Sequence, residues 1–464
     1  MTLIKSISGI RGIIGGKPGK GLTPVDIISF TSAFAVLLAT RHPNQKLNVV
    51  VGRDARTSGA MVNHLVSGTL MAMGVNVTDV GLSTTPTVEI AVAELNAHGG
   101  IILTASHNPG QWNALKLLNN LGEFISEDDG KELIALASEA KYSYAPVDKL
   151  GTVAQNNGLV ELHIEKILNL PLVDVQAIRK AGFCIAIDAV NSTGGIAIPL
   201  LLKALGVEKQ LLLNCEPTGH FPHNPEPLPE NLTQISDAVV RSDANVGFAV
   251  DPDVDRLAII CEDGSMFGEE YTLVAVADYV LQHTPGNTVS NLSSTRALRV
   301  ITENSGGSYF ASAVGEVNVV EMMKKHNAVI GGEGNGGIIY PALHYGRDAL
   351  AGIALFLSYL AKSGKSASQL RRQYPDFHMS KNKVILPDEV NAEMVIKEIS
   401  LKYSSFPQNL LDGVRIEFGE DWVHLRLSNT EAIIRIYAES ATPATAEVLA
   451  MKIIDDIKSV IPRT

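Results

Sequence analysis

The stretch Val49-Val50-Val51-Gly52-Arg53-Asp54 places an apolar run directly before a glycine and two charged residues, and a helical pattern follows it. Two later segments repeat this order, since Ile185-Ala186-Ile187 leads into Asp188 and Val289 leads into the polar segment 290–295. Apolar strands, polar loops and helices in alternation are typical of α/β units with mostly parallel sheets. The wide spacing of the pattern predicts three related α/β domains, because a solenoid would repeat at shorter intervals.

The pattern changes beyond Pro375, where a helical run is followed by three short strand-like segments and a last helix over Ala444–Ile461. This order is typical of a smaller α+β domain. Breaks near residues 146–151, after Arg256 and around 363–375 separate the units. We therefore expect three α/β domains with mixed, mostly parallel sheets over residues 1–150, 151–258 and 259–368, and an α+β domain over 369–464.

Composition excludes several classes of protein. The chain has 464 residues, 45% of them hydrophobic, so several domains with buried cores are expected. A net charge of −11 without a basic stripe argues against nucleic acid as a partner, and the absence of a long uninterrupted apolar run argues against a membrane span. Three widely separated cysteines indicate the cytoplasm. The expected partner is a small molecule, and the oligomeric state is left open.

The first chemical motif is Thr104-Ala105-Ser106-His107-Asn108-Pro109, which follows the apolar run Ile101-Ile102-Leu103 and precedes Lys116. A serine beside a histidine at a strand end can act as a nucleophile or a phosphate carrier. The serine-hydrolase elbow needs glycines two residues to either side, where this chain has Thr104 and Asn108. Phosphoryl chemistry therefore suits Ser106 better than acyl transfer.

The second motif is Asp251-Pro252-Asp253-Val254-Asp255-Arg256, which lies between two apolar strands. In an extended backbone the three carboxylates share one face, and a hard cation such as Mg²⁺ would neutralise their repulsion. An EF-hand loop would need glycine where Arg256 stands. The remaining alternative is a solvated acidic turn, which becomes less favoured beside a phosphate-type serine loop.

The third motif is the glycine-rich stretch Gly331-Gly332-Glu333-Gly334-Asn335-Gly336-Gly337. It matches the dinucleotide fingerprint formally, but the following Ile338-Ile339-Tyr340-Pro341 is extended, whereas the fingerprint opens a helix. We expect Glu333 and Asn335 to hydrogen-bond sugar hydroxyls from a permissive backbone. A tight glycine turn with an incidental glutamate is the alternative.

A fourth motif and two arginine-bearing segments complete the candidates. Arginines and hydroxyl groups after a strand suit a phosphate cradle, and the alternative is a polar hairpin turn; the cradle residues are Arg426, Ser428, Asn429, Thr430 and Arg435. Arg11, which has Gly9 and Gly12 on either side, is a further candidate for a ligand contact, although a lone arginine is more often a surface residue. The segment Arg53-Asp54-Ala55-Arg56 is interpreted as a structural ion-pair turn.

These motifs, taken in order over essentially the full length, resemble those of the α-D-phosphohexomutase superfamily. The resemblance implies four domains around a central cleft and an active form phosphorylated on Ser106. It also implies that Mg²⁺ is held by phosphorylated Ser106, Asp251, Asp253 and Asp255. In this family the phosphoserine converts a hexose monophosphate into a hexose 1,6-bisphosphate, and the other phosphate then returns to the serine.

The resemblance also suggests roles for the charged residues. Arg11 and Arg256 would neutralise the transferred phosphoryl group, and either Lys116 or His107 would carry the hydroxyl proton. The Arg426 cradle would hold the phosphate that does not react.

The sequence departs from the family at the sugar site. Many bacterial relatives have a histidine where this chain has Gly337, and our alignment places Glu316 and Ser293 where the dual-specificity enzymes have a histidine and a lysine. An acidic Glu316 or Glu333 would favour a protonated 2-amino group.

The sequence therefore predicts a phosphoglucosamine mutase of the archaeal type, an isomerase that transfers phosphate within one sugar. The alternatives are a phosphomannomutase/phosphoglucomutase and, more remotely, a sugar-phosphate hydrolase. A non-catalytic sugar-phosphate sensor and a dinucleotide oxidoreductase are weaker hypotheses.

Overall fold

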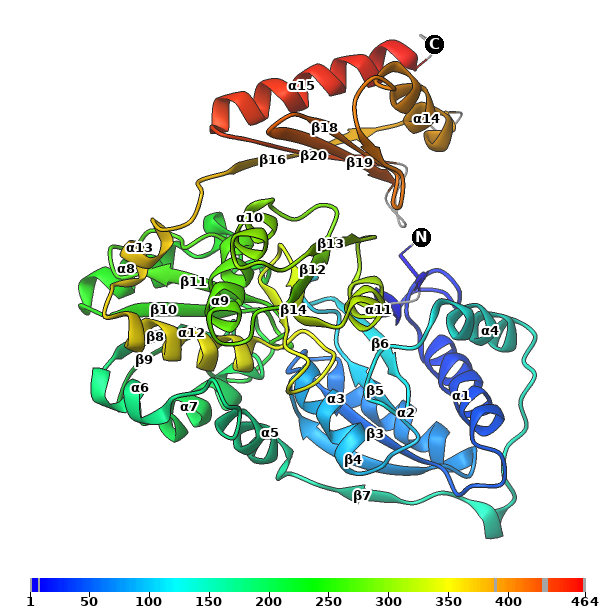
Figure 1. Ribbon diagram of the computed structural model, residues 1–464. Coiled ribbons are helices and arrows are strands. Elements are labelled where there is room, and N and C mark those ends of the chain that lie inside the picture. Colours follow the sequence, from blue (N-terminus) through cyan, green and yellow to red (C-terminus); the bar gives the residue numbers. More distant parts are fainter. Residues whose placement is uncertain (1, 7–8, 388–389, 428–432, 462–464) are drawn as a thin grey trace.

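The structure is a computed structural model that describes residues 2–6, 9–387, 390–427 and 433–461. It contains four sheets, one for each of four units arranged along the chain, which we call units I to IV. Units I to III lie together, and unit IV stands apart at the top of the molecule in Figure 1, connected by the segment that leads into β16. The expected fold class, three related α/β units and a smaller C-terminal unit, is confirmed.

Unit I is built on a seven-stranded sheet in the order β1-β2-β6-β5-β3-β4-β7. Apolar runs such as Val49-Val50-Val51 are fully buried strands between helices. Its elements are β1 (Ile4–Ser6), β2 (Gly9–Ile13), α1 (Pro24–Arg41), β3 (Asn48–Arg53), α2 (Gly59–Ala72), β4 (Asn76–Leu82), α3 (Thr85–Glu94), β5 (Gly99–Leu103), β6 (Trp112–Leu118), α4 (Glu127–Ser138), the short 3₁₀ helix η1 (Val147–Lys149) and β7 (Val153–Gln155).

Units II and III each have a four-stranded sheet, ordered β11-β10-β8-β9 and β13-β12-β14-β15. The elements of unit II are α5 (Leu159–Leu168), α6 (Val175–Ala181), β8 (Cys184–Asp188), α7 (Gly194–Ala204), β9 (Lys209–Leu213), η2 (Pro229–Asn231), α8 (Thr233–Arg241), β10 (Val246–Val250) and β11 (Leu257–Cys261). Those of unit III are α9 (Glu269–His283), β12 (Asn287–Asn291), α10 (Ala297–Asn304), β13 (Tyr309–Ser312), α11 (Glu316–His326), β14 (Ala328–Glu333), β15 (Gly337–Ile339), α12 (Ala349–Ser363) and α13 (Ala367–Arg371).

The three α/β units share one strand arrangement. In each, a central strand (β3, β8 or β12) pairs in parallel with two neighbours, and one of those neighbours pairs with an antiparallel strand. The antiparallel strands are β6, β11 and β15. The recurrence expected from the strand-loop-helix pattern is therefore a recurrence of topology.

Unit IV is a five-stranded antiparallel sheet in the order β16-β20-β19-β18-β17. Helix α15 lies over the sheet on the side away from the other units, and α14 lies beside it (Figure 1). The elements are β16 (His378–Ile385), α14 (Ala392–Lys402), β17 (Gln408–Asn409), β18 (Val414–Phe418), β19 (Asp421–Leu427), β20 (Ile433–Ser440) and α15 (Pro443–Val460).

The hydrophobic cores follow these units, except that Leu159 of α5 packs in a cluster of unit I and that units II and III share a core. Units II and III share a single core cluster that extends from Ile164 to Tyr374. Helix α12 lies in the middle of it and buries every residue from Ala349 to Leu360. Because a fully buried helix cannot leave either neighbour without exposing apolar surface, units II and III form one mechanical body.

Among the described residues, one helix, α1, is long and apolar enough to cross a membrane by length and composition alone. Of its most apolar window, 56% is buried inside the structure. A helix that packs in a protein core has the same length and composition, so these features of α1 are weak evidence for a membrane span.

Candidate active site

The predicted site residues come from three equivalent connections. The Ser106 loop joins β5 to β6, the Asp251–Arg256 loop joins β10 to β11, and the Glu333 loop joins β14 to β15. Each connection begins at the carboxyl end of a parallel strand and returns along the antiparallel strand of its unit. Ligands of α/β proteins bind at that end of the sheet. The shared topology therefore directs the three loops to one place.

The Ser106 loop is held in a strained conformation. Ser106 has a φ of +48°, in the left-handed region that non-glycine residues rarely adopt. Its amide donates to Thr104 Oγ1 at 3.0 Å, and the guanidinium of Arg56 donates to the carbonyls of Ser106 and Asn108. Arg56 is fully buried and pairs with Asp54 at 2.9 Å. The predicted ion-pair turn thus also clamps the serine loop.

The Ser106 hydroxyl donates to Asp251 Oδ2 at 2.6 Å, which joins the first loop to the second. The three carboxylates Asp251, Asp253 and Asp255 are completely buried, and one oxygen of each lies within 4.8 Å of the others. Burial and the two neighbouring aspartates raise the pKa of Asp251 well above its usual range. Such a cluster calls for a cation.

A divalent cation fits the unpaired oxygens of this cluster. Oδ1 of Asp253 and Oδ1 of Asp255 are buried and accept no hydrogen bond from any described residue. Buried carboxylate oxygens that lack a donor are costly, and hard oxygen ligands are those that Mg²⁺ prefers. The other oxygen of Asp253 accepts from Thr85 Oγ1 at 2.6 Å, so one side of the carboxylate is fixed while Oδ1 is left for a metal.

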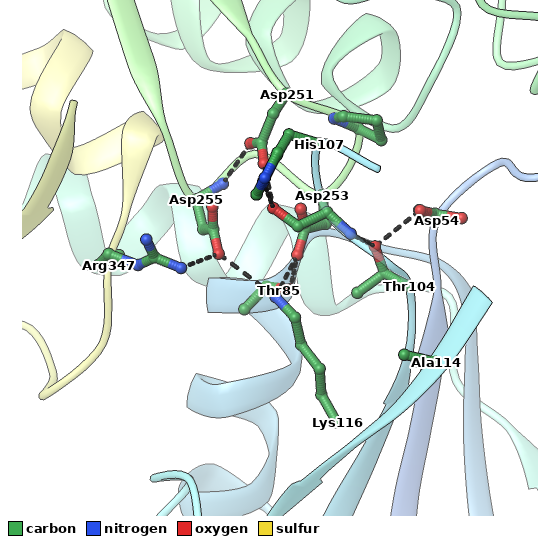
Figure 2. A network of polar contacts seen from close by, with 12 residues as sticks. Asp54, Thr85, Thr104, His107, Ala114, Lys116, Asp251, Asp253, Asp255 and Arg347 are labelled. Atoms are coloured by element: carbon green, nitrogen blue, oxygen red, sulfur yellow. Dashed lines mark hydrogen bonds and ion pairs between the residues drawn. The ribbon is translucent and has the colours of Figure 1, made fainter. Parts of the chain in front are cut away.

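Lys116, on β6, lies beneath the same carboxylates. Its Nζ donates to Asp253 Oδ2 at 2.7 Å and to Asp255 Oδ2 at 3.3 Å (Figure 2). Burial alone would lower the pKa of Lys116, but Asp253 and Asp255 outweigh it and raise that pKa above its ordinary value. Lys116 is therefore a fixed positive charge here.

His107 lies on the opposite side of the serine. Its Nδ1 is 3.4 Å from Ser106 Oγ. Burial, and next the positive charge of Arg256, hold the pKa of His107 well below its ordinary value, so the imidazole is neutral. Burial and Arg256 likewise lower the pKa of Arg11. Two neighbouring guanidinium groups beside the serine make a place for an anion.

Arg347 is the residue of this network that the sequence analysis did not single out. It comes just before α12 and contacts three carboxylates, Asp255 at 2.7 Å, Glu333 at 2.9 Å and Glu316 at 3.0 Å. Burial opposes its charge, yet Asp255, Glu316 and Glu333 raise the pKa of Arg347 well above its ordinary value. One buried cation therefore ties the metal-type cluster to both glutamates of the predicted sugar site.

The glutamates have further partners in unit III. Glu333 Oε1 accepts from Asn291 Nδ2 at 2.9 Å and from the amide of Gly315 at 3.1 Å. Glu316 begins α11, and its Oε1 accepts from the amide of Arg347 at 3.0 Å. Asn335 Oδ1 accepts from the amide of Gly337 at 3.2 Å, which closes the glycine turn.

The predicted phosphate cradle is described in part. Arg426 on β19 and Arg435 on β20 are cross-strand partners, and Arg426 lies 3.4 Å from Asp412. Like charges directly opposite in a sheet repel unless an anion lies between them. Ser428, Asn429 and Thr430 lie outside the described residues.

Comparison with known proteins agrees with this arrangement. The chain matches all four domains of the phosphoglucomutase/phosphomannomutase family: α/β/α domain I over residues 3–144, domain II over 161–264, domain III over 268–377 and the C-terminal domain over 383–456.

Individual relatives match over nearly their whole length. A phosphoglucomutase/phosphomannomutase of Thermococcus kodakarensis is 34% identical over 94% of each chain, and a probable phosphoglucosamine mutase of Pyrococcus horikoshii is 32% identical over 98% of this chain and 97% of its own. A family protein of Burkholderia thailandensis, solved by crystallography, superposes with a TM-score of 0.84 at 25% identity, covering 98% and 97% of the two chains. With every domain present and in order, the chain belongs to the phosphoglucomutase/phosphomannomutase family.

Proposed function

We propose that this phosphohexomutase interconverts glucosamine 6-phosphate and glucosamine 1-phosphate. The observation that carries the reaction type is the 2.6 Å contact between Ser106 Oγ and Asp251 Oδ2 at the edge of the buried aspartate cluster. A phosphoryl group on that oxygen would stand between the carboxylates, which would share a metal with it, and the Arg11–Arg256 pair.

In the proposed cycle Ser106 begins phosphorylated. A sugar hydroxyl attacks the phosphorus, the bond from phosphorus to Ser106 Oγ breaks, and hexose 1,6-bisphosphate forms. The other phosphate then returns to Ser106 Oγ by the reverse step, so no phosphate is lost. Mg²⁺ held by Ser106, Asp251, Asp253 and Asp255 would neutralise charge on the transferred group.

His107 is our choice for the group that takes the hydroxyl proton. It is 3.4 Å from the serine oxygen, whereas Lys116 Nζ is already bonded to two carboxylates. A proton acceptor must reach the reacting oxygen and have a free lone pair. Lys116 would then stabilise the carboxylates that face the phosphate.

The choice of an amino sugar rests on charge. Glu316 and Glu333 are both buried and share the single guanidinium of Arg347, which Asp255 also uses. This surplus of negative charge on the unit III side would favour a substrate that carries an ammonium group. Asn335 would add a hydrogen bond to the sugar, and Arg426 and Arg435 with residues 428–430 would hold the phosphate that does not react.

Glucose and mannose phosphates are the second candidate substrates. The 34% identical relative named phosphoglucomutase/phosphomannomutase favours them. We further propose that the units divide close to the predicted boundaries, between β7 and α5, after β11 and after α13, and that the enzyme works in the cytoplasm, a view supported by three unpaired cysteines.

The reaction type is tested by mass spectrometry and turnover. Purified protein should carry one phosphate on Ser106, and Ser106→Ala should lose both that phosphate and isomer formation. Steady release of inorganic phosphate without an isomer would instead show a hydrolase.

The sugar is tested by measuring kcat/KM for glucosamine, glucose and mannose 6-phosphates in wild type and in Glu316→Gln. A hydrogen bond to a charged group is worth about 1.5–3 kcal/mol, so the preference for glucosamine should fall roughly 10- to 150-fold in the variant. Damage to folding would affect all three sugars alike, and the exposed Glu321→Gln on the same helix is the matched control. A wild-type preference for glucose or mannose would refute the choice.

A further inference from the structure

A second cluster of ligand-type side chains lies outside the active site, where units I, II and III meet. The Nε2 atoms of His163 and His344 both point to one oxygen of Asp348, at 2.8 Å and 3.3 Å from Oδ2. The three ligand atoms lie within 4.8 Å of one another. His163 comes from α5 of unit II, while His344 and Asp348 precede α12 of unit III.

Each member of the cluster is oriented by an outer partner. His163 Nδ1 is 2.9 Å from Thr87 Oγ1, and His344 Nδ1 is 3.3 Å from Glu89 Oε2. Both partners lie on α3 of unit I. Asp348 Oδ1 accepts from two amides at the start of α12, which leaves Oδ2 for the histidines. Metal-bound histidines and carboxylates are typically held in this way, by hydrogen bonds on the side away from the metal.

The cluster also gathers two buried carboxylates around the two imidazoles. Asp348 is 1% exposed and Glu89 is 2% exposed, and Glu89 Oε2 is paired with His344 Nδ1 at 3.3 Å. With both imidazoles neutral, the two carboxylates lack a compensating charge, and a divalent cation would balance both.

We propose that His163, His344 and Asp348 form a second metal site, selective for a divalent transition-metal ion of the zinc class. Two imidazoles and one carboxylate are ligands that Zn²⁺ takes in tetrahedral sites, and they are poor ligands for Mg²⁺. The aspartate cluster beside Ser106 offers only oxygens, so the two sites differ in the ion they select. The His344 side chain is 13% exposed, which leaves water access for the fourth position.

An ion at this position would join units II and III through their own side chains, and its two histidines would contact unit I through Thr87 and Glu89. Asp348 directly follows Arg347, the arginine that contacts Asp255, Glu316 and Glu333. A metal-bound Asp348 would therefore also fix the start of α12 and the backbone next to that arginine. The role that we assign to the site is structural. It is therefore tested by measuring metal binding and the thermal stability of the protein.

The experiment uses the full-length enzyme stripped of metals with a chelator and titrated with Co²⁺ in an excess of Mg²⁺. Cobalt bound by two histidines and a carboxylate gives visible absorption bands, whereas an all-oxygen site absorbs weakly. We expect one absorbing Co²⁺ per chain, displaced by Zn²⁺, and a thermal midpoint that rises with Zn²⁺. Asp253→Asn should keep the bands, because it changes only the aspartate cluster.

Variants decide which residues hold the ion. His163→Gln and His344→Gln should each weaken binding beyond the roughly 100-fold loss typical of a missing outer partner, and Thr87→Val should weaken it about 10-fold. His223→Gln is the matched control, since His223 is 3.2 Å from a buried aspartate, Asp188, but lacks a second histidine there. Wild-type protein that shows neither the absorption bands nor a thermal midpoint that depends on Zn²⁺ would overturn the proposal. The two histidines would then be joined to Asp348 by hydrogen bonds alone. Bands that persist in both histidine variants would overturn it as well.

Discussion

Replacement of Arg347 by methionine should destabilise units II and III strongly and in a pH-dependent way. At an effective dielectric constant of about 20, each of its three contacts at 2.7–3.0 Å is worth about 6 kcal/mol before desolvation. Desolvation of the four buried groups cancels most of this gain. Removing one partner of such a cluster therefore costs about 3–5 kcal/mol net, because the remaining charges stay buried without compensation.

The expected size of the effect follows from the shared core. Units II and III form one hydrophobic cluster from Ile164 to Tyr374, so they should unfold as one cooperative body of about 200 residues. In a body of that size, a loss of about 1 kcal/mol in the free energy of unfolding lowers the midpoint of thermal unfolding by about 2–4 °C. Arg347→Met should therefore lower that midpoint by roughly 6–20 °C at pH 8.

The sign of the pH dependence identifies the cause. Without the arginine, the folded-state pKa values of Asp255 and Glu316 rise, because burial raises both and Arg347 is the charge that most strongly lowers them. The resulting stability deficit appears as pH increases through that window. The variant should therefore recover part of its midpoint at pH 5, measured by differential scanning calorimetry. Arg299→Met is the matched control, since Arg299 pairs with Glu303 at the exposed surface, where such a pair contributes at most about 1 kcal/mol. A midpoint loss in Arg347→Met no larger than in this control, or one equal at both pH values, would refute the reasoning.

Two further predictions concern neighbouring parts of the molecule. Burial lowers the pKa of His424 to about 4, below its ordinary value of about 6.5, so the contact of unit IV with unit III should weaken as pH falls from 6.5 toward 4. Fluorescence of Trp422, which is buried beside this contact, should report the change, and His424→Asn should abolish its pH dependence. Gly336→Ala should lower the thermal midpoint more than Gly306→Ala: both have φ near +80°, but only the Cβ at Gly336 would lie 2.4 Å from a carbonyl oxygen, that of Leu257.

Much of the fold could be predicted because its repeat is local. Each α/β unit encodes a buried parallel strand next to a polar loop. The apolar run and the polar or glycine residues that end it can be identified without knowledge of the other units. The aspartate cluster could be predicted for the same reason, since Asp251, Asp253 and Asp255 are close in sequence as well as in space.

Arg347 could not be predicted in this way. Its partners Asp255, Glu316 and Glu333 are 92, 31 and 14 residues away, and only the packing of α12 between units II and III brings the arginine to them. The sequence assigns Glu333 to the sugar from its glycine-rich loop and Glu316 from its aligned position in the family. In the structure the same carboxylates also compensate a buried guanidinium, a pairing for which spacing gives no indication.

Contacts between units III and IV are equally hidden from the sequence. Arg415 donates to the carbonyl of Leu292 at 2.7 Å, and His424 Nδ1 lies 2.9 Å from Ser293 Oγ. Ser293 stands where we aligned a sugar-binding lysine, and its hydroxyl is instead engaged by unit IV. Residues 131 apart in sequence form this pair, so no local pattern could have indicated it.

The junction between units II and III differs from the junction between units III and IV. This difference bears on how one site could bind a sugar phosphate by either end. Units II and III are joined by a continuous apolar core, whereas the contacts named above between units III and IV are hydrogen bonds, worth about 0.5–1.5 kcal/mol for the pair of His424 and Ser293 and about 1.5–3 kcal/mol for the one that Arg415 donates. Water could replace such bonds at little net cost, but it could not replace the buried face of α12. The aspartates and Arg347 therefore belong to a rigid body, to which Ser106 of unit I is joined through Asp251, while the arginines of β19 and β20 belong to the part that can most readily move. Such a division suits the proposed cycle, because the reacting phosphate needs fixed geometry while the bisphosphate must be released and held again with its ends exchanged.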